Sequence, residues 1–206
     1  MEPIYDARYF EENYRSYELQ NPPRKLAFYR GLLERTLGGG RAPRILEVGC
    51  AFGRFLSALD PGWQHFGIDV SEFAIGACRQ VLPDARLAVA SGAAIPFAGE
   101  FDAIVAFDVL EHIAALDRVR DSLHSKLAPG GYLIFVVPVY DGPTGPLIRL
   151  LDRDATHVHK RSRRFWLEWV GAGLQVVEWW GIYRYLLPGG CTCTGRPAVC
   201  ATSLPP

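Results

Sequence analysis

Short apolar runs alternate with amphipathic stretches through the middle of the chain. Apolar runs predict strands at residues 44–48, 63–68, 86–89, 101–107 and 132–137. Apolar positions at helical spacing predict helices at residues 24–37, 53–59, 71–80, 116–127 and 162–172. Continuous apolar strands separated by helices favour a parallel sheet that is covered by helices on both faces.

Two further strands are predicted near the end of the chain, at residues 174–179 and 197–202, with no helix between them. Such neighbours pair in antiparallel fashion. The predicted fold is therefore α/β: a Rossmann-like, seven-stranded, mostly parallel sheet with a final antiparallel strand and helices on both faces. Ser71 and Ser162 are expected to cap helices, and helices are expected to stop at Gly38, Gly130 and Gly173.

The length of 206 residues favours one domain over the whole chain. We expect an N-terminal helical segment at residues 1–40, a core at 41–140, and a loop, helix and closing strands at 141–206. Charged residues make up 21% of the chain and balance to a formal net charge of zero. The protein therefore has no net positive charge that would attract nucleic acid or an anionic membrane. Five scattered cysteines, without paired C-x2-C spacing, favour reduced thiols.

The remaining features of the whole chain concern its location. No apolar run is long enough to span a membrane, and the first residues lack the basic-then-apolar order of a secretory signal. The sequence therefore predicts a cytoplasmic protein with no nucleic-acid or membrane partner. It leaves the oligomeric state open.

A glycine-rich turn follows the first core strand. The chain runs from Arg44-Ile45-Leu46-Glu47-Val48 into Gly49-Cys50-Ala51-Phe52-Gly53 and then into a predicted helix. Small residues at positions 49, 51 and 53 let a ligand approach the backbone closely, and a helix start directs amide N–H groups toward it. Taken alone, this pattern indicates either a nucleotide-binding turn or only a tight strand-to-helix connection.

A carboxylate at the end of the second strand favours a nucleotide-binding turn over a merely structural connection. Asp69 lies 20 positions after Gly49, where it can accept hydrogen bonds from both hydroxyls of a ribose. Nicotinamide dehydrogenases and methyltransferases share this spacing, but the dehydrogenase pattern needs a third glycine at the position of Arg54. The turn instead has the acidic Glu47 two positions before its first glycine.

At these residues the chain resembles the class I S-adenosylmethionine-dependent methyltransferases. Three more stretches match the family's motifs in order: Ser91-Gly92-Ala93-Ala94-Ile95-Pro96-Phe97, residues 101–112, and Leu127-Ala128-Pro129-Gly130-Gly131. The motifs cover roughly residues 40 to 140. The resemblance therefore implies a helical lid segment at residues 1–40, a cofactor-binding core at 41–140, and a substrate-side loop, helix and closing strands at 141–206. Ala51 stands in place of the middle glycine, and Ser91 stands where the family usually has an adenine-contacting Asp.

The resemblance implies a binding site for S-adenosylmethionine and for its product, S-adenosylhomocysteine. Gly49, Cys50, Ala51 and Gly53 would lie along the methionine part of the cofactor. Glu47 would reach the cofactor's amino group, directly or through water. Ala51 still permits close approach of the ligand.

The same resemblance assigns the nucleoside part of the site. Asp69 would bind the ribose hydroxyls, and Val70 would contact an adenine face. Ser91 and Gly92 would meet the adenine edge, with the Ser91 hydroxyl a weaker acceptor than a carboxylate. Phe107 would offer its main-chain carbonyl beside the reacting centre, while its ring packs in the core.

Two histidines are the candidate catalytic residues. His157 ends a long connection at residues 138–156, on the substrate side of the predicted sheet, and is the preferred general base; the alternative is a histidine that anchors the loop. His112 belongs to an Asp108-Val109-Leu110-Glu111-His112 cluster, where packing or capping is the alternative. A similar cluster in quinone-biosynthesis O-methyltransferases is linked to a divalent cation, but helix-start hydrogen bonds explain it as well, and we predict no metal.

Charged and aromatic groups flank these candidates. The cations Lys160, Arg161, Arg163 and Arg164 either attract an anionic substrate or form a solvated first helical turn. Phe165, Trp166, Trp169, Trp179 and Trp180 are expected in the core, with one or two lining a substrate cleft. The N-terminal aromatics are expected to cover the cofactor as a lid or to form a docked arm: Tyr5, Tyr9, Phe10, Tyr14 and Tyr17.

The predicted function is methyl transfer from S-adenosylmethionine to a small-molecule acceptor. Oxygen is the expected acceptor atom, with nitrogen and carbon left open. Two other classes remain. A nicotinamide-dependent oxidoreductase is disfavoured by Arg54 and by the Leu-x-Pro-Gly-Gly segment. A non-catalytic, cofactor-binding partner subunit is kept open by the substitutions at positions 51 and 91.

Overall fold

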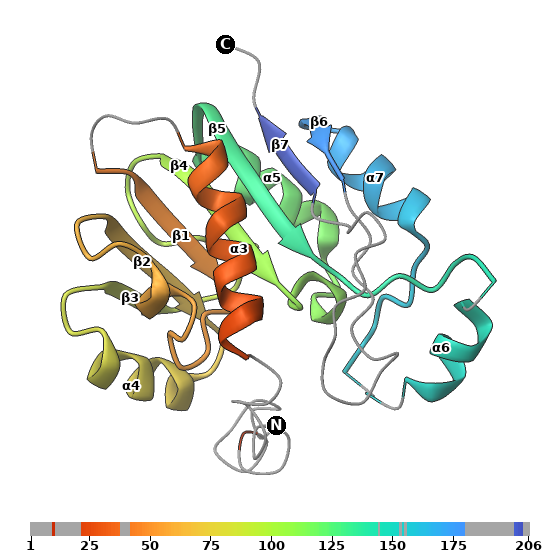
Figure 1. The fold of residues 1–206 in the computed structure, drawn as a ribbon, viewed down its shortest axis with the longest axis horizontal. Coiled ribbons are helices and arrows are strands. Elements are labelled where there is room, and N and C mark those ends of the chain that lie inside the picture. Colours follow the sequence, from red (N-terminus) through yellow and green to blue (C-terminus); the bar gives the residue numbers. More distant parts are fainter. Residues whose placement is uncertain are drawn as a thin grey trace.

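The computed structural model describes residues 10, 22–37, 42–143, 145–152, 154, 156–179 and 200–203. Five parallel strands form the main part of its sheet, in the order β3-β2-β1-β4-β5 (Figure 1). They are β1 (Arg44–Val48), β2 (Gln64–Asp69), β3 (Arg86–Val89), β4 (Phe101–Phe107) and β5 (Leu127–Val136). The predicted α/β, Rossmann-like arrangement of a parallel sheet and helices is confirmed.

Beyond β5 the sheet continues with two short strands. The strand β7 (Cys200–Ser203) pairs antiparallel with β5, and β6 (Gln175–Glu178) pairs antiparallel with β7. The expected antiparallel pairing of the last two strands is therefore present. The first part of the predicted strand at 197–202 lies outside the described residues, as do Cys191, Cys193 and Trp180.

The helices lie on both faces of the sheet (Figure 1). They are α3 (Pro23–Thr36), α4 (Glu72–Val81), α5 (Leu116–Lys126), α6 (Gly145–Leu151) and α7 (Arg163–Gly171). The Ser71 hydroxyl accepts the N–H of Ala74 and the Ser162 hydroxyl that of Phe165, both at 3.2 Å, so both predicted caps form. Within the described ranges, no helix has the length and apolarity needed to cross a membrane.

Alternate residues of the central strands build two separate cores. Leu46, Val48 and Ile104 point to the face that α5 and α7 cover. Ile45 and Val105 point to the opposite face and pack with side chains of α3 and α4. Because successive strand residues face opposite sides, an unbroken apolar run fits a strand that is buried on both faces. This explains why the apolar runs located β1 and β4 correctly.

Two expectations about local structure are wrong, and the long connection contains an additional helix. The helix expected at residues 53–59 is only a 3-10 turn, η1 (Leu56–Ala58), because the segment is confined between Gly53 at a φ of 72° and Pro61. Gly130 does not end a helix; it lies inside β5 at a φ of 75°, where the pairing with β4 shifts register. The long connection contains α6, whose first turn tolerates Pro146 because first-turn N–H groups lack helical partners.

Gly131 should be essential for the pairing of β4 with β5. A Cβ at this position would lie 2.8 Å from the Ala128 carbonyl oxygen and 2.9 Å from that of Phe101. Because both obstacles are backbone atoms, we expect Gly131→Ala to lower the free energy of unfolding by about 1–3 kcal/mol. Urea denaturation measures this loss.

Gly31→Ala is the matched control, because a Cβ there meets nothing within 4 Å in the interior of α3. It should raise stability by about 0.5–1 kcal/mol, as alanine favours helices. Equal losses in both variants would contradict the packing argument.

Candidate functional site

The predicted cofactor residues meet at the carboxyl edge of the sheet. β1 lies between β2 and β4, so the chain leaves β1 toward one side of the sheet and later returns to the other side. Ligands of open α/β sheets bind at this kind of switch point, just outside the strand ends. The turn after β1, the end of β2, the loop after β3 and the end of β4 all reach this edge.

At two positions the turn after β1 has a left-handed backbone, which favours glycine. Gly49 and Gly53 have φ values of 74° and 72°. A Cβ on Gly49 would lie 2.3 Å from Val109 Cγ2, and one on Gly53 would lie 2.5 Å from Cys78 Sγ. Ala51 also has a positive φ, of 43°, although it carries a side chain. The turn is therefore strained at Ala51 and tightly packed at its glycines.

Asp69 fixes this turn to the next one. Its Oδ2 accepts the Ala51 N–H at 3.0 Å, and its Oδ1 accepts the Ser71 N–H at 2.9 Å. Burial raises the pKa of Asp69, and the backbone hydrogen bonds oppose that rise. A carboxylate accepts about four hydrogen bonds, so lone pairs remain for ribose hydroxyls. The structure thus gives Asp69 a second role that the sequence did not suggest.

Glu47 carries a buried oxygen that suits a cationic ligand group. The residue is only 5% exposed, and its Oε2 has no hydrogen-bond partner within the described part of the chain. Burial, followed by the nearby Cys78 and Asp69, raises the pKa of this carboxyl well above its usual value. Buried polar atoms without partners are uncommon and destabilising. An ammonium group of a bound ligand would satisfy this oxygen.

The predicted adenine side is more open. The Val70 side chain is exposed beside the end of β2, and the Ser91 hydroxyl accepts the Ala93 N–H at 3.2 Å. Gly92 is buried, and a Cβ there would lie 3.1 Å from Val48 Cγ1. The Ser91 hydroxyl keeps its proton and one lone pair for a ligand.

Phe107 and Phe10 add aromatic packing near the edge. The Phe107 ring stacks on Tyr29 with centroids 4.2 Å apart, so its side chain belongs to the core. Phe10 is buried and packs on Phe52 of the turn and on Phe73 of α4, at 5.1 and 5.9 Å between centroids. The other N-terminal aromatics, Tyr5, Tyr9, Tyr14 and Tyr17, lie outside the described residues.

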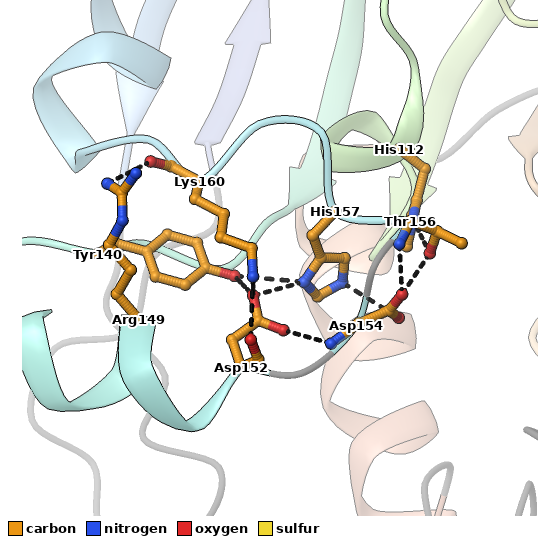
Figure 2. Close-up of polar contacts among 8 residues, drawn as sticks. All are labelled: His112, Tyr140, Arg149, Asp152, Asp154, Thr156, His157 and Lys160. Atoms are coloured by element: carbon orange, nitrogen blue, oxygen red, sulfur yellow. Dashed lines mark hydrogen bonds and ion pairs between the residues drawn. The ribbon is translucent and has the colours of Figure 1, made fainter.

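Both candidate catalytic histidines lie at the same edge, beside each other. His112 ends the 3-10 turn η2 (Leu110–His112) after β4, and its ring centroid is 4.7 Å from that of His157. The loop after α6 docks on η2, because the His159 N–H donates to the Glu111 carbonyl at 3.0 Å. Two segments more than 40 positions apart in the sequence thus present their imidazoles together (Figure 2).

His157 contacts a buried carboxylate. Its Nδ1 lies 2.8 Å from Asp152 Oδ2, and the same oxygen lies 3.1 Å from Lys160 Nζ (Figure 2). The Tyr140 hydroxyl donates to this oxygen as well. Burial tends to raise the pKa of Asp152, but the hydrogen bonds from Tyr140, His157 and other donors hold it below the ordinary range. Asp152 is therefore a carboxylate at neutral pH.

His112 has a parallel set of contacts. Its Nδ1 lies 2.9 Å from the Thr156 hydroxyl oxygen, and that hydroxyl donates to Asp154. Burial, and then the neighbouring His157, lowers the pKa of His112. The imidazole is therefore neutral at physiological pH, as a proton acceptor must be.

One group of side chains in the described region has ligand atoms spaced for a metal ion. An oxygen of Glu111 and one nitrogen each of His112 and His157 lie within 4.8 Å of one another. Carboxylate and imidazole ligands suit several divalent transition metals. The sequence analysis considered Asp108 rather than His157 in this cluster, and it predicted no metal; that remains a prediction.

The cations after His159 make contacts within the chain. Lys160 binds Asp152, and Arg164 binds Glu168 at 2.6 Å. Arg161 and Arg163 lie over aromatic rings at 4.8 and 4.9 Å from the centroids. These contacts favour the reading of a solvated helical turn over that of an anion-binding patch.

Several residues of the histidine cluster carried no assigned role in the sequence analysis. The loop that contains His157 also contains Asp152, Asp154 and Thr156. Two acidic residues so close to a candidate catalytic histidine could have been recognised from the sequence as candidate partners of its ring. Tyr140 gives no such signal, because only the fold of the long connection brings it to Asp152.

A cavity of about 610 Å³ lies elsewhere, between α5 and α7. Leu116, Arg120, His159, Phe165 and Trp169 are among its lining residues, and none of the predicted cofactor residues is. The candidate cofactor site is thus formed by the loops of the sheet edge and not by this cavity.

Comparisons of sequence agree with this site. A family model described as a methyltransferase domain matches residues 14–178. Nodulation protein S from Sinorhizobium fredii is 32% identical over 111 residues, which are 50% of this chain and 51% of that protein. Ubiquinone biosynthesis O-methyltransferase from Aromatoleum aromaticum is 31% identical over 99 residues, which are 45% of this chain and 42% of that protein. The chain spans about half or less of these curated relatives.

Solved structures share the fold. N-methyltransferase NodS from Bradyrhizobium japonicum has a TM-score of 0.66 at 23% identity, with 90% of this chain and 98% of that chain covered. A possible histamine N-methyltransferase from Thermotoga maritima has a TM-score of 0.68 at 16% identity, with 94% and 97% covered. The methyltransferase-domain match also decides between the two cofactors that the Asp69 spacing left open. The chain belongs to the class I S-adenosylmethionine-dependent methyltransferases.

Proposed function

We propose that the chain transfers a methyl group from S-adenosylmethionine to an oxygen of a small-molecule acceptor, with His157 as general base. The observation that carries this proposal is the pair of imidazoles at the sheet edge that also bears the glycine turn. An acceptor hydroxyl must lose its proton as it attacks, and a neutral imidazole is suited to take it.

The methionine end of the cofactor is proposed to lie along Gly49, Cys50, Ala51 and Gly53. The left-handed backbone of this turn and the absence of room for side chains at its glycines support close approach of a ligand. Glu47 would accept a hydrogen bond from the cofactor's ammonium group through Oε2. That contact would give the buried oxygen its missing partner.

The nucleoside end is proposed to bind at Asp69, Val70, Ser91 and Gly92. The remaining lone pairs of Asp69 suit the two ribose hydroxyls. Val70 offers an exposed apolar surface for an adenine face. Phe107 would contribute its main-chain carbonyl, while its ring keeps the end of β4 packed against α3.

The proposed reaction is an in-line displacement. Bound S-adenosylmethionine supplies the electrophilic methyl group of its sulfonium. His157 takes the proton of the acceptor hydroxyl while a bond forms between the acceptor oxygen and the methyl carbon. The sulfur–methyl bond breaks, and its electron pair stays on sulfur in S-adenosylhomocysteine. His112, kept neutral by burial, borders His157 and is proposed to contact the acceptor.

Two features of the wider chain complete the proposal. The relatives' names include an O-methyltransferase and an N-methyltransferase, which supports a small-molecule acceptor. The contact of Phe10 with Phe52 of the turn supports an N-terminal segment that covers the cofactor. We keep the single-domain division of the sequence analysis as part of this proposal.

Glu47→Gln should stabilise the cofactor-free protein at alkaline pH and weaken cofactor binding. A carboxyl whose pKa is raised in the folded state contributes stability below its unfolded pKa of about 4.5, and that contribution is lost as the pH rises through the raised value. Glutamine does not ionise, so this pH-dependent loss of stability is absent in the variant. In the absence of cofactor, its free energy of unfolding should exceed that of the wild type at pH 8, and by a smaller difference at pH 5. Urea denaturation at both pH values measures this.

The same Glu47→Gln variant should bind S-adenosylmethionine about tenfold or more weakly, since a charge-assisted hydrogen bond contributes about 1.5–3 kcal/mol. Isothermal titration gives the affinity. Unchanged affinity would show that Glu47 does not bind the ammonium group.

His157→Gln should lower kcat about 10²- to 10⁴-fold, the usual contribution of a general base. Catechol and glucosamine can represent phenol and sugar acceptors, with S-adenosylhomocysteine formation as the readout. Affinity for S-adenosylmethionine should not change, because His157 contacts Tyr140, Asp152, Asp154 and His112 and not the proposed cofactor residues. His65→Gln is the matched control, since His65 lies in β2 and its ring contacts the Asp60 carbonyl. Full activity of His157→Gln would refute the base assignment.

A further inference from the structure

Four donors converge on the carboxylate of Asp152. Oδ2 receives the Tyr140 hydroxyl, His157 Nδ1 at 2.8 Å and Lys160 Nζ at 3.1 Å (Figure 2). Oδ1 accepts the Asp154 N–H at 3.0 Å. The Asp152 side chain is only 10% exposed, although it directly follows α6 in a surface connection. Such a concentration of contacts on one loop carboxylate calls for a specific role.

Neutralising the buried charge does not require His157. The ammonium group of Lys160 already supplies a full positive charge, and the Tyr140 hydroxyl and the Asp154 N–H supply two more hydrogen bonds. A buried carboxylate with such partners is stably ionised. The main effect of the contact between Asp152 and His157 is therefore to fix the imidazole, because the other partners already stabilise the ionised carboxylate.

The constraint selects one form of the imidazole ring. An ionised carboxylate only accepts hydrogen bonds, so Nδ1 of His157 must carry the hydrogen that faces Asp152. In the neutral ring the lone pair is then on Nε2. Asp154 Oδ2 lies 3.6 Å from this Nε2, where it can stabilise the ring after Nε2 has taken a proton.

We propose that Asp152 is a positioning residue for His157, which fixes the ring orientation and the Nδ1–H tautomer so that Nε2 receives the acceptor's proton. This inference rests on the proposed function of His157 as base. Tyr140 and Lys160 hold the carboxylate in place from other parts of the chain: Tyr140 follows β5, and its N–H donates to the Arg161 carbonyl at 3.0 Å. Asp152 stays ionised throughout, and the proton moves only from the acceptor oxygen to Nε2.

The decisive experiment compares Asp152→Asn with the wild type by 15N NMR of the histidine side chains. Both proteins are saturated with S-adenosylhomocysteine at pH 8, so the measurement does not depend on the acceptor. We expect the wild-type His157 signals of an Nδ1–H ring, and in Asp152→Asn a mixture of tautomers or the Nε2–H form. The same Nδ1–H signature in both proteins would overturn the proposal.

Kinetics give a second readout. With whichever of catechol and glucosamine the wild type turns over, Asp152→Asn should lower kcat about 10²-fold or more, because an imidazole in the wrong tautomer cannot act as base. The KM for the acceptor and the affinity for S-adenosylmethionine should stay within about twofold, since a positioning role affects the proton transfer. Asp121→Asn, an exposed carboxylate on α5 that pairs with Arg120, is the matched control and should keep full activity.

Tyr140→Phe covers the case in which Asp152→Asn does not fold. It removes one neutral donor from the carboxylate and leaves its charge and Lys160 in place. We expect a smaller fall in kcat, about tenfold, with the Nδ1–H ring still dominant but less ordered. Unchanged kcat and unchanged His157 signals in this variant would overturn the proposal.

The outcomes also separate this inference from the proposed function. An inactive His157→Gln together with a fully active Asp152→Asn would refute positioning by Asp152 and leave His157 as base. A fully active His157→Gln would refute the base itself, whatever Asp152 does.

Discussion

The hydrogen bonds of Asp69 to the backbone hold the candidate cofactor site in shape. One carboxylate oxygen binds the N–H of Ala51 in the turn after β1, and the other binds the N–H of Ser71 at the start of α4. Holding a residue other than glycine in a left-handed conformation, as at Ala51, costs about 1–2 kcal/mol. A hydrogen bond to a charged group contributes about 1.5–3 kcal/mol and can offset that cost. The group proposed to bind ribose thus also maintains the turn proposed to surround methionine.

The histidine cluster depends on a different kind of constraint. Its two imidazoles come from the turn after β4 and from the connection between α6 and α7, and a backbone hydrogen bond from His159 to Glu111 joins these segments. The turn after β4 is rigidly placed because β4 is buried in the middle of the sheet. Functional loops carried on a rigid sheet are a common arrangement. The proposed methyl-donor site and the proposed proton acceptor therefore lie at the same edge of the sheet.

Much of this could be predicted from the sequence, for identifiable physical reasons. Buried parallel strands require continuous apolar runs, which located β1 and β4 at their observed bounds. The bounds of β3 were also predicted, although β3 is a partly exposed strand at the edge of the sheet. The glycine turn and Asp69 were recognisable because their backbone angles and spacing permit few residue types. The position of Gly130 inside β5 was not predictable from local pattern, since it depends on pairing with β4.

Contacts between distant segments were likewise hidden from the sequence. Three such contacts appear only once the chain is folded: the second role of Asp69, the Glu47 oxygen that lacks a partner among the described residues, and the convergence of Tyr140 on Asp152. The central claim, that S-adenosylmethionine binds across the turn after β1 and the end of β2, is tested most directly by a crystal structure with S-adenosylhomocysteine. We predict both ribose hydroxyls within hydrogen-bonding distance of Asp69, and the amino group on Glu47 Oε2. A ligand bound elsewhere, or a ribose away from Asp69, would contradict the account.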